Sequence, residues 1–122
     1  MFNDLVIIVV GSRKWRRPDR VHWILDSYMP RVVVETNAPG AALHARQWLA
    51  RHGLPSRSYT ADWKFHGKLA TQKRDDRMLE EWHRYHNVRV CAFPLKGDAE
   101  TWYCMEAAVS LGVNVENYGE GV

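Results

Sequence analysis

The stretch Leu5–Val10, read as LVIIVV, decides the fold, and it stops abruptly at Gly11-Ser12-Arg13. Six branched apolar residues in a row do not alternate with polar ones, which is typical of a strand buried on both faces inside a parallel sheet. A glycine, a hydroxyl and a guanidinium then precede a predicted helix. Open α/β sheets bind ligands at the carboxyl ends of such strands, so this turn predicts an anion-binding site.

The bulk composition predicts one globular domain over residues 1–122. The chain has 46% apolar and 25% charged residues, and its length is too short for two self-sufficient cores. No apolar run approaches the roughly 18 residues that a membrane span needs. No basic segment precedes LVIIVV, so we expect no signal peptide, no membrane partner and a cytoplasmic location. The net charge of +3 suits a phosphate-bearing partner without requiring nucleic acid.

The cysteines and histidines do not form a recognisable metal motif. Cys91 and Cys104 each fall inside a predicted element, which predicts buried free thiols in a reducing compartment. His83 and His86 lie three residues apart on a predicted helix without a third ligand nearby. We therefore expect neither a metal nor a cofactor.

The six tryptophans divide into two groups. Trp15 and Trp63 fall in predicted loops beside glycine or charge, where we expect a stacking role. The others fall in helix patterns and are expected to pack in the core: Trp23, Trp48, Trp82 and Trp102.

Predicted strands and helices alternate along the whole chain. Strands are expected at 5–10, 32–35, 56–61, 89–93 and 114–118, and helices at 18–29, 40–52, 69–86 and 99–111. Right-handed crossovers between such βαβ units produce a parallel sheet with helices on both faces. The sequence therefore predicts a Rossmann-like three-layer α/β sandwich with five parallel strands in the order 3-2-1-4-5. A crevice is expected between strands one and four, where the chain reverses direction.

Four loops follow the first four strands and are expected to meet at one edge of the sheet. In the loop after strand one, Gly11 lets the backbone come close to a phosphate. The backbone amides that follow, from Ser12 on, are expected to point outward near the start of a helix. Arg13 is suited to bind a phosphate or carboxylate through two parallel hydrogen bonds. The alternative is a plain turn on a solvated basic surface.

The loop after strand two offers small residues at a helix N-terminus. Asn37 and Gly40 are expected to bring backbone amides close to a ligand. In the alternative interpretation, Asn37 or Thr36 only caps the helix.

The loop after strand three is long, polar and aromatic. Asp62 is expected to accept hydrogen bonds from a ribose or base, and Trp63 to stack, with Lys68 and Arg74 close by. In the alternative, Asp62 pairs with Arg74 or Lys68 and only braces the loop.

The loop after strand four is similar to a phosphate cradle. Pro94 and Gly97 form a turn ahead of Thr101 at a helix start. Thr101 is equally suited to be a capping residue alone.

Together these segments resemble the YspA-like stand-alone branch of the SLOG superfamily, the Rossmann-like group that includes Smf/DprA and the LOG-type phosphoribohydrolases. The resemblance is carried by Gly11-Ser12-Arg13, by Ala61-Asp62-Trp63 with Gly67, Lys68, Ala70, Arg74 and Met78, and by Phe93-Pro94 with Gly97 and Thr101. It implies binding of a nucleotide or nucleotide-derived molecule, such as an ADP-ribose-type signal, for sensing or sequestration. It also implies a homo-oligomer, a dimer or a tetramer.

Two departures from the family pattern bear on catalysis. Ala42 stands where the branch has an acid, and Cys104 stands three residues after Thr101, where the LOG-type motif has its catalytic glutamate. Hydrolysis of a ribosyl bond needs a carboxylate near the sugar, so the sequence favours binding over catalysis. Two alternatives stay open. One is a hydrolase of a nucleotide N-glycosidic or phosphate bond. The other is a nucleic-acid-binding protein of Smf/DprA type that uses Arg13, Arg16, Arg17 and Lys64.

Overall fold

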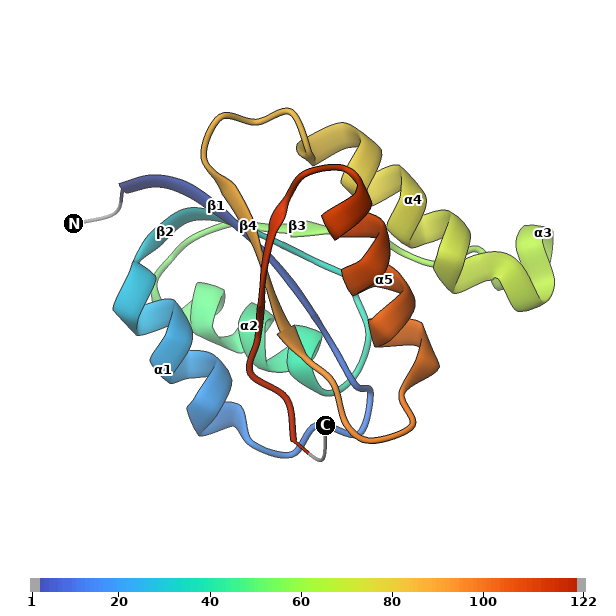
Figure 1. Cartoon of the computed structure of the whole chain (residues 1–122). Helices are drawn as coiled ribbons and strands as arrows, with labels where there is room; N and C mark the ends of the chain where they lie inside the picture. Colours follow the sequence, from blue (N-terminus) through green and yellow to red (C-terminus); the bar gives the residue numbers. More distant parts are fainter. Residues whose placement is uncertain (1–2, 121–122) are drawn as a thin grey trace.

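A computed structural model describes residues 3–120, in which five strands form one parallel sheet in the order β3-β2-β1-β4-β5 (Figure 1). The strands are β1 (Asn3–Gly11), β2 (Pro30–Glu35), β3 (Ser56–Ser58), β4 (Val88–Phe93) and β5 (Asn114–Asn117). The predicted Rossmann-like fold and strand order are confirmed.

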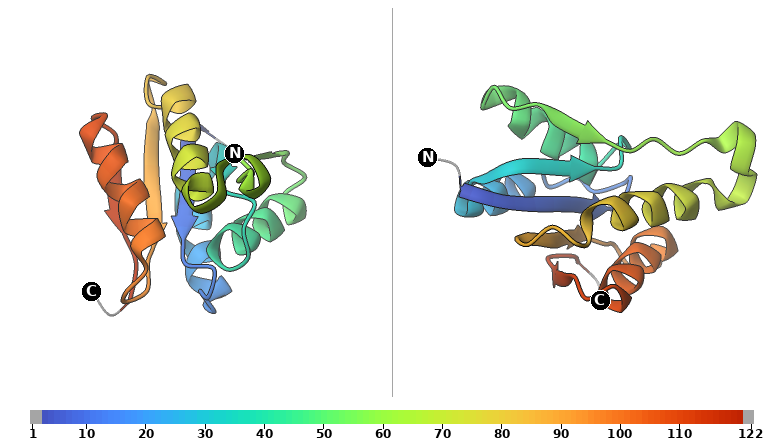
Figure 2. Two further views of the ribbon diagram at one scale, coloured as in Figure 1. Left: turned by 90° about the vertical axis from the view of Figure 1, so that its right-hand side faces the viewer. Right: turned by 90° about the horizontal axis from the view of Figure 1, so that it is seen from above.

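Helices cover both faces of this sheet (Figure 2). One layer holds α1 (Pro18–Tyr28) and α2 (Ala41–Arg51), and the other holds α4 (Ala70–Trp82) and α5 (Ala99–Ser110). A short helix α3 (Trp63–His66) and a 3-10 helix (Gly67–Leu69) lie between β3 and α4. No helix within residues 3–120 is long and apolar enough to cross a membrane.

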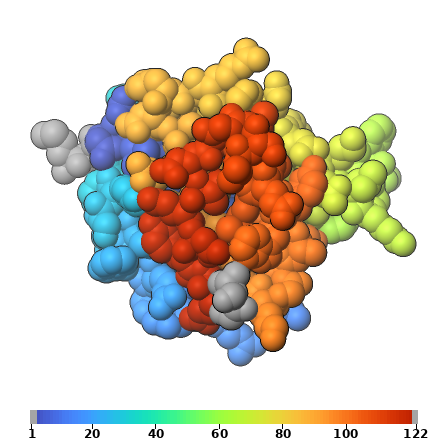
Figure 3. All heavy atoms as spheres, viewed as in Figure 1, coloured from blue at the N-terminus to red at the C-terminus, as the bar shows by residue number. Residues whose placement is uncertain are grey.

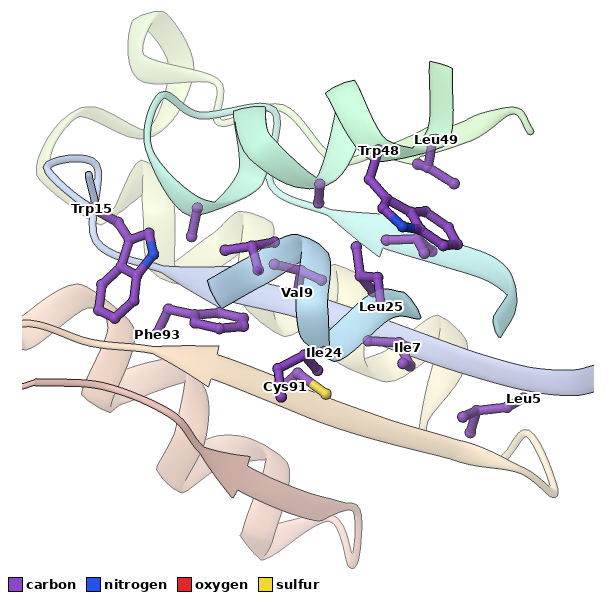
Figure 4. Packing of buried hydrophobic residues seen from close by; sticks show 14 residues of the cluster. Leu5, Ile7, Val9, Trp15, Ile24, Leu25, Trp48, Leu49, Cys91 and Phe93 are labelled. Carbon is purple, nitrogen blue, oxygen red and sulfur yellow. The ribbon is translucent and has the colours of Figure 1, made fainter. Parts of the chain in front are cut away.

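The central strand β1 contributes side chains to the hydrophobic core on both faces of the sheet. Its residues alternate between the two layers, with Ile7 and Val9 packed towards α1 and α2, and Val6, Ile8 and Val10 towards α4 and α5. Figure 4 shows the first of these clusters, in which Ile7 and Val9 lie among side chains of α1, α2 and β4. Each such side chain contributes roughly 1.5–3 kcal/mol by leaving water, which explains why LVIIVV contains no polar residue.

Two tryptophans lie where the sequence did not predict them. Trp15 is buried rather than available for stacking on a ligand, because its ring packs edge-on against Phe93 at 5.4 Å (Figure 4). Its indole Nε1 donates to the carbonyl of Arg17 at 3.0 Å, so the loop satisfies the polar end of the ring. Trp23 was expected in the core but is 66% exposed on the outer side of α1.

The segment between β3 and β4 also differs from the prediction. β3 ends at Ser58 and not at residue 61, and the loop that follows contains helical turns. The helix expected to reach residue 86 ends at Trp82. Beyond this helix end, the Tyr85 hydroxyl donates to the Asp4 carbonyl and the His86 ring contacts the Asp4 carboxylate at the start of β1.

Candidate functional site

A crevice opens where the carboxyl ends of β1 and β4 meet, at the predicted point of reversal. It has a volume of about 370 Å³ and is lined by Gly11–Lys14 from the loop after β1 and by Leu95–Glu100 from the loop after β4. The sheet order places β1 beside β4, so two loops more than 80 residues apart face each other. We refer to this space as the crevice.

Ser12 and Gly11 build the first wall of the crevice. The Ser12 amide donates to the Phe93 carbonyl at 3.0 Å, which ties the loop to β4. The Ser12 hydroxyl accepts from the Lys14 amide at 3.0 Å, so this buried side chain shapes the turn. A Cβ on Gly11 would lie 2.6 Å from the Ala41 Cβ, which only glycine avoids.

Three cationic side chains line the crevice. The Arg13 Nε lies 3.5 Å from the Glu100 Oε2, and its guanidinium carbon lies 5.6 Å from the centre of the Trp63 ring. This ion pair is about half exposed and therefore weak. Lys14 and Lys96 have no ion-pair partner among residues 3–120. These three side chains are therefore available to bind an anion, because none of them forms a strong ion pair within residues 3–120.

Backbone donors add to this positive character. The amide N–H groups of Arg13, Lys96 and Gly97 donate to no acceptor within the described part of the chain. Unpaired amides on a loop at the carboxyl edge of a sheet are suited to bind phosphate oxygens. The first turn of α5 is less available, because the Asp98 side chain already accepts from the Thr101 amide at 3.2 Å.

The Thr101 side chain is also bound to the capping residue Asp98. Its buried hydroxyl donates to the Asp98 carboxylate, so in this structure it is not a free donor. Thr101 is therefore bound to the capping residue and is not the cap itself, so the alternative that Thr101 only caps the helix is wrong. Asp98, rather than Thr101, is the N-cap of α5.

A small hollow lies beside the crevice and shares Gly11, Arg13 and Glu100 with it. Its volume of about 20 Å³ is room for about one water molecule. Arg74 lines the hollow, and its side chain is only 6% exposed. The Arg74 Nε donates to Asp75 at 3.0 Å, and neither Nη donates to any residue from 3 to 120. Arg74 therefore brings unused donors to this space.

Two of the other side chains that line the hollow, Asp75 and Cys104, are buried and titratable. Burial raises the pKa of the Asp75 carboxyl from 3.8 to about 6, although neighbouring Arg74 opposes the shift. Burial holds the pKa of the Cys104 thiol well above its usual value. Cys104 is therefore protonated at neutral pH and is not poised as a nucleophile.

The loop after β2 supports the crevice from behind. Asn37 faces away from it, since its side-chain amide donates to the Thr60 hydroxyl at 3.1 Å. A Cβ on Gly40 would lie 2.2 Å from the Ser12 carbonyl, so Gly40 lets the two loops touch. Gly40 itself is the N-cap of α2 and receives no side-chain cap, so the alternative interpretation, a cap by Asn37 or Thr36, is wrong.

The loop after β3 contributes one side chain to the neighbourhood of the crevice. Trp63 lies beside Arg13, whereas Asp62 accepts from the Phe65 amide at 3.0 Å and caps α3. Asp62 has no ion pair with Lys68 or Arg74, so the bracing interpretation is wrong. Lys68 is exposed on the 3-10 helix, outside the residues that line the crevice and the hollow.

Pro94 lies next to the crevice but does not line it. The residue is buried, and its carbonyl accepts from the Glu120 amide at 3.1 Å. It therefore anchors the C-terminal segment to the loop after β4.

The structure brings together part of the predicted site and adds residues to it. Of the predicted residues, Gly11, Ser12, Arg13 and Gly97 line the crevice, and Arg74 and Thr101 line the hollow. Five charged lining residues were not among the predicted site residues: Lys14, Asp75, Lys96, Asp98 and Glu100. Arg74 and Asp75 stand in a run of five charged residues, 73–77, which is typical of an exposed helix face, yet both are buried. Among residues 3–120, no group of three or more histidine, cysteine or acidic side chains is placed to hold a metal ion.

A parallel sheet of this order, with its crevice at the carboxyl ends of β1 and β4, defines a Rossmann-like α/β protein. Residues 5–66 match the family described as "YspA, cpYpsA-related SLOG family". The chain is 31% identical over 125 aligned residues to "Gene 61 protein" of Mycobacterium phage D29, which covers 93% of this chain and 96% of that protein. No solved structure matches the chain significantly. The chain belongs to the YspA, cpYpsA-related SLOG family.

Proposed function

We propose that this protein binds a nucleotide or a nucleotide-derived small molecule in the crevice, for sensing or sequestration. The observation that carries the proposal is the meeting of Arg13, Lys14 and Lys96 with unpaired backbone amides at the junction of β1 and β4. This combination is suited to a phosphate or diphosphate. Membership of the SLOG family supports a nucleotide-related ligand.

The base and the sugar of a nucleotide would also find partners, at the edges of the crevice. Trp63 is half exposed beside Arg13 and offers an aromatic face to a base. The unused Arg74 donors lie in the hollow, where one oxygen or water fits. The ligand thus lies across the mouth of the crevice, with its phosphate on the loops after β1 and β4.

Calorimetric titration with AMP, ADP, ADP-ribose and inorganic phosphate tests this proposal. We expect a nucleotide to bind more tightly than phosphate alone. The double variant Lys14→Ala/Lys96→Ala should bind at least tenfold more weakly. The variant Lys73→Ala/Arg84→Ala removes the same charge from exposed positions outside the crevice, and it should bind like the wild type. Equal weakening in both double variants would assign the effect to net charge and contradict the proposal.

The two alternative functions have less support from the described residues. For nucleic acid, Arg17 faces two carboxylates, Asp19 and Glu120, which lowers the positive charge that it offers to a phosphate backbone. For hydrolysis, Asp98 is engaged as the cap of α5, and Glu100 is the one other carboxylate that lines the crevice. Chromatography of the titrated nucleotides would reveal any turnover, and steep salt dependence of oligonucleotide binding would reveal the other alternative.

A further inference from the structure

The chain between β3 and α4 leaves the body of the molecule as an arm, residues 60–69, which contains α3 and the 3-10 helix (Figures 1 and 2). The space-filling view shows it projecting beside α5 (Figure 3). The arm exposes Trp63 by 51%, Phe65 by 80% and Leu69 by 51%. Large apolar side chains gathered on one projection mark an interaction surface rather than scattered surface variation.

A second unpartnered apolar surface lies along the outer edge of α5. We call it the α5 groove, and it has a volume of about 510 Å³. It is lined by Trp102, Met105, Glu106, Val109, Ser110, Val115 and Asn117. β5 is the edge strand of the sheet, and within residues 3–120 no helix lies beyond α5 to cover this side. Val109 is consequently 62% exposed.

The arm and the α5 groove carry complementary charge. Lys64 and Lys68 lie on either side of Phe65, and they outnumber the one carboxylate of the arm, Asp62, which caps α3. The α5 groove contains Glu106, and the last turn of α5 has no basic residue to balance the partial negative charge of the helix end. A different groove, beside α4, carries two guanidinium groups, Arg57 and Arg77, against one carboxylate, Glu81, and its net positive charge suits the arm less well. Charge therefore favours the α5 groove as the place where such an arm binds.

We propose that the arm of one copy of this chain docks into the α5 groove of a second copy, and that the second arm docks reciprocally. The two contacts are then related by a two-fold axis, as in most soluble dimers. Phe65 is the anchor, because an aromatic side chain in an apolar pocket with a charged rim is the usual centre of a binding surface. This inference does not depend on the proposed function. It does connect to it, because Trp63 at the base of the arm lies beside Arg13.

Sedimentation analysis of the full chain between about 1 and 100 µM tests the docking. We expect a dimer, and we expect Phe65→Ser and Val109→Lys each to raise its dissociation constant at least tenfold. Both side chains are exposed, so circular dichroism should show an unchanged fold. Leu43→Ser, at an exposed site on α2, is the matched control and should leave the dissociation constant unchanged.

Mixing the two variants provides the decisive result. The Phe65→Ser copy keeps an intact α5 groove, and the Val109→Lys copy keeps an intact arm. Their mixture should therefore associate more tightly than either variant alone, through one restored contact. A wild-type chain that stays monomeric at about 100 µM would overturn the proposal. A dimer weakened by Val109→Lys but not by Phe65→Ser would also overturn it, and would indicate pairing of β5 edges instead. A mixture no tighter than its components would exclude the reciprocal arrangement.

Discussion

Arg74 and Asp75 are consecutive residues on α4, yet both side chains are buried and the Arg74 Nε donates to the Asp75 Oδ1 at 3.0 Å. Adjacent positions on a helix do not face each other, so this pair is formed by bending both side chains towards the hollow that they line. The guanidinium uses one donor on the carboxylate and keeps the others for the hollow. The pair therefore couples the charge of Asp75 to the donors offered at the proposed site.

The protonation of Asp75 should make stability depend on pH. Its pKa rises from 3.8 to about 6, chiefly because burial disfavours the charged form. The folded protein therefore holds this proton more tightly than the unfolded chain does. The stabilisation that the folded protein gains by holding the Asp75 proton is fully present below about pH 4. It is lost as the pH rises to about 6.

Replacing Asp75 by asparagine removes this loss. The difference between 3.8 and about 6 corresponds to about 3 kcal/mol. We expect Asp75→Asn to be more stable than the wild type at pH 8 by up to this amount, with the difference narrowing towards pH 4. Urea denaturation of both proteins across this range measures it. A variant less stable than the wild type at pH 8 would mean that the ion pair with Arg74 outweighs the cost of burial.

Arg13 should contribute strongly to ligand affinity and little to stability. Its ion pair with Glu100 is half exposed, so folding does not depend on it. We expect Arg13→Ala to weaken binding of whichever nucleotide the protein takes by about 1.5–3 kcal/mol, the scale of a lost charge-assisted hydrogen bond. Thr101→Ala should weaken it less, because the Thr101 hydroxyl is engaged with Asp98.

Arg31 provides the control for this measurement. It is exposed at the amino-terminal end of β2, on the opposite edge of the sheet from the crevice, and has no ion-pair partner among residues 3–120. Arg31→Ala changes the net charge equally and should leave the affinity unchanged. Calorimetry that finds unaltered affinity for Arg13→Ala would place the ligand elsewhere.

The sheet was predictable because its signals are local. Leu5–Val10 is apolar at every position, and only a central strand buries both of its faces. The alternation of strands and helices then left few topologies, and the loops that meet at one edge followed from the strand order. Gly11 and Arg13 were identified in this way.

The residues that were missed depend on contacts distant in sequence. Nothing near Asp75 in the sequence indicates that its side chain is buried against α5, so its charge suggested an exposed helix face. Trp15 follows a basic turn, and only the approach of Phe93 from β4 buries it. Phe65 is the opposite case, an apolar residue that is exposed. It lies on the arm, where no other element packs against it to bury it.

Glu35 should be the most sensitive buried charge at this edge of the sheet. Its fully buried carboxylate accepts from Arg46 at 3.0 Å, from the Asn37 amide at 2.6 Å and from Ser58. We expect Glu35→Ala to lower the free energy of unfolding by about 3–5 kcal/mol, because Arg46 loses its counter-ion and the loop after β2 loses its anchor. Glu80→Ala, at an exposed position on α4, should change it by less than about 0.5 kcal/mol. Urea denaturation compares them, and equal losses would contradict this role for Glu35.

Gly40 joins the loops after β1 and β2, and its replacement should affect the crevice as well as the fold. Gly40 has a φ of +78° and its Cβ would lie 2.2 Å from the Ser12 carbonyl, whereas Gly53 has a φ of +65° with nothing within 4 Å. Gly53→Ala thus carries only the backbone cost of about 1–2 kcal/mol. Gly40→Ala adds a collision with backbone that must move the turn bearing Arg13. We expect it to be the less stable variant in thermal denaturation and the only one of the two to weaken nucleotide binding. Equal losses of stability and of affinity in the two variants would show that the loops after β1 and β2 can move apart to make room for a Cβ at residue 40.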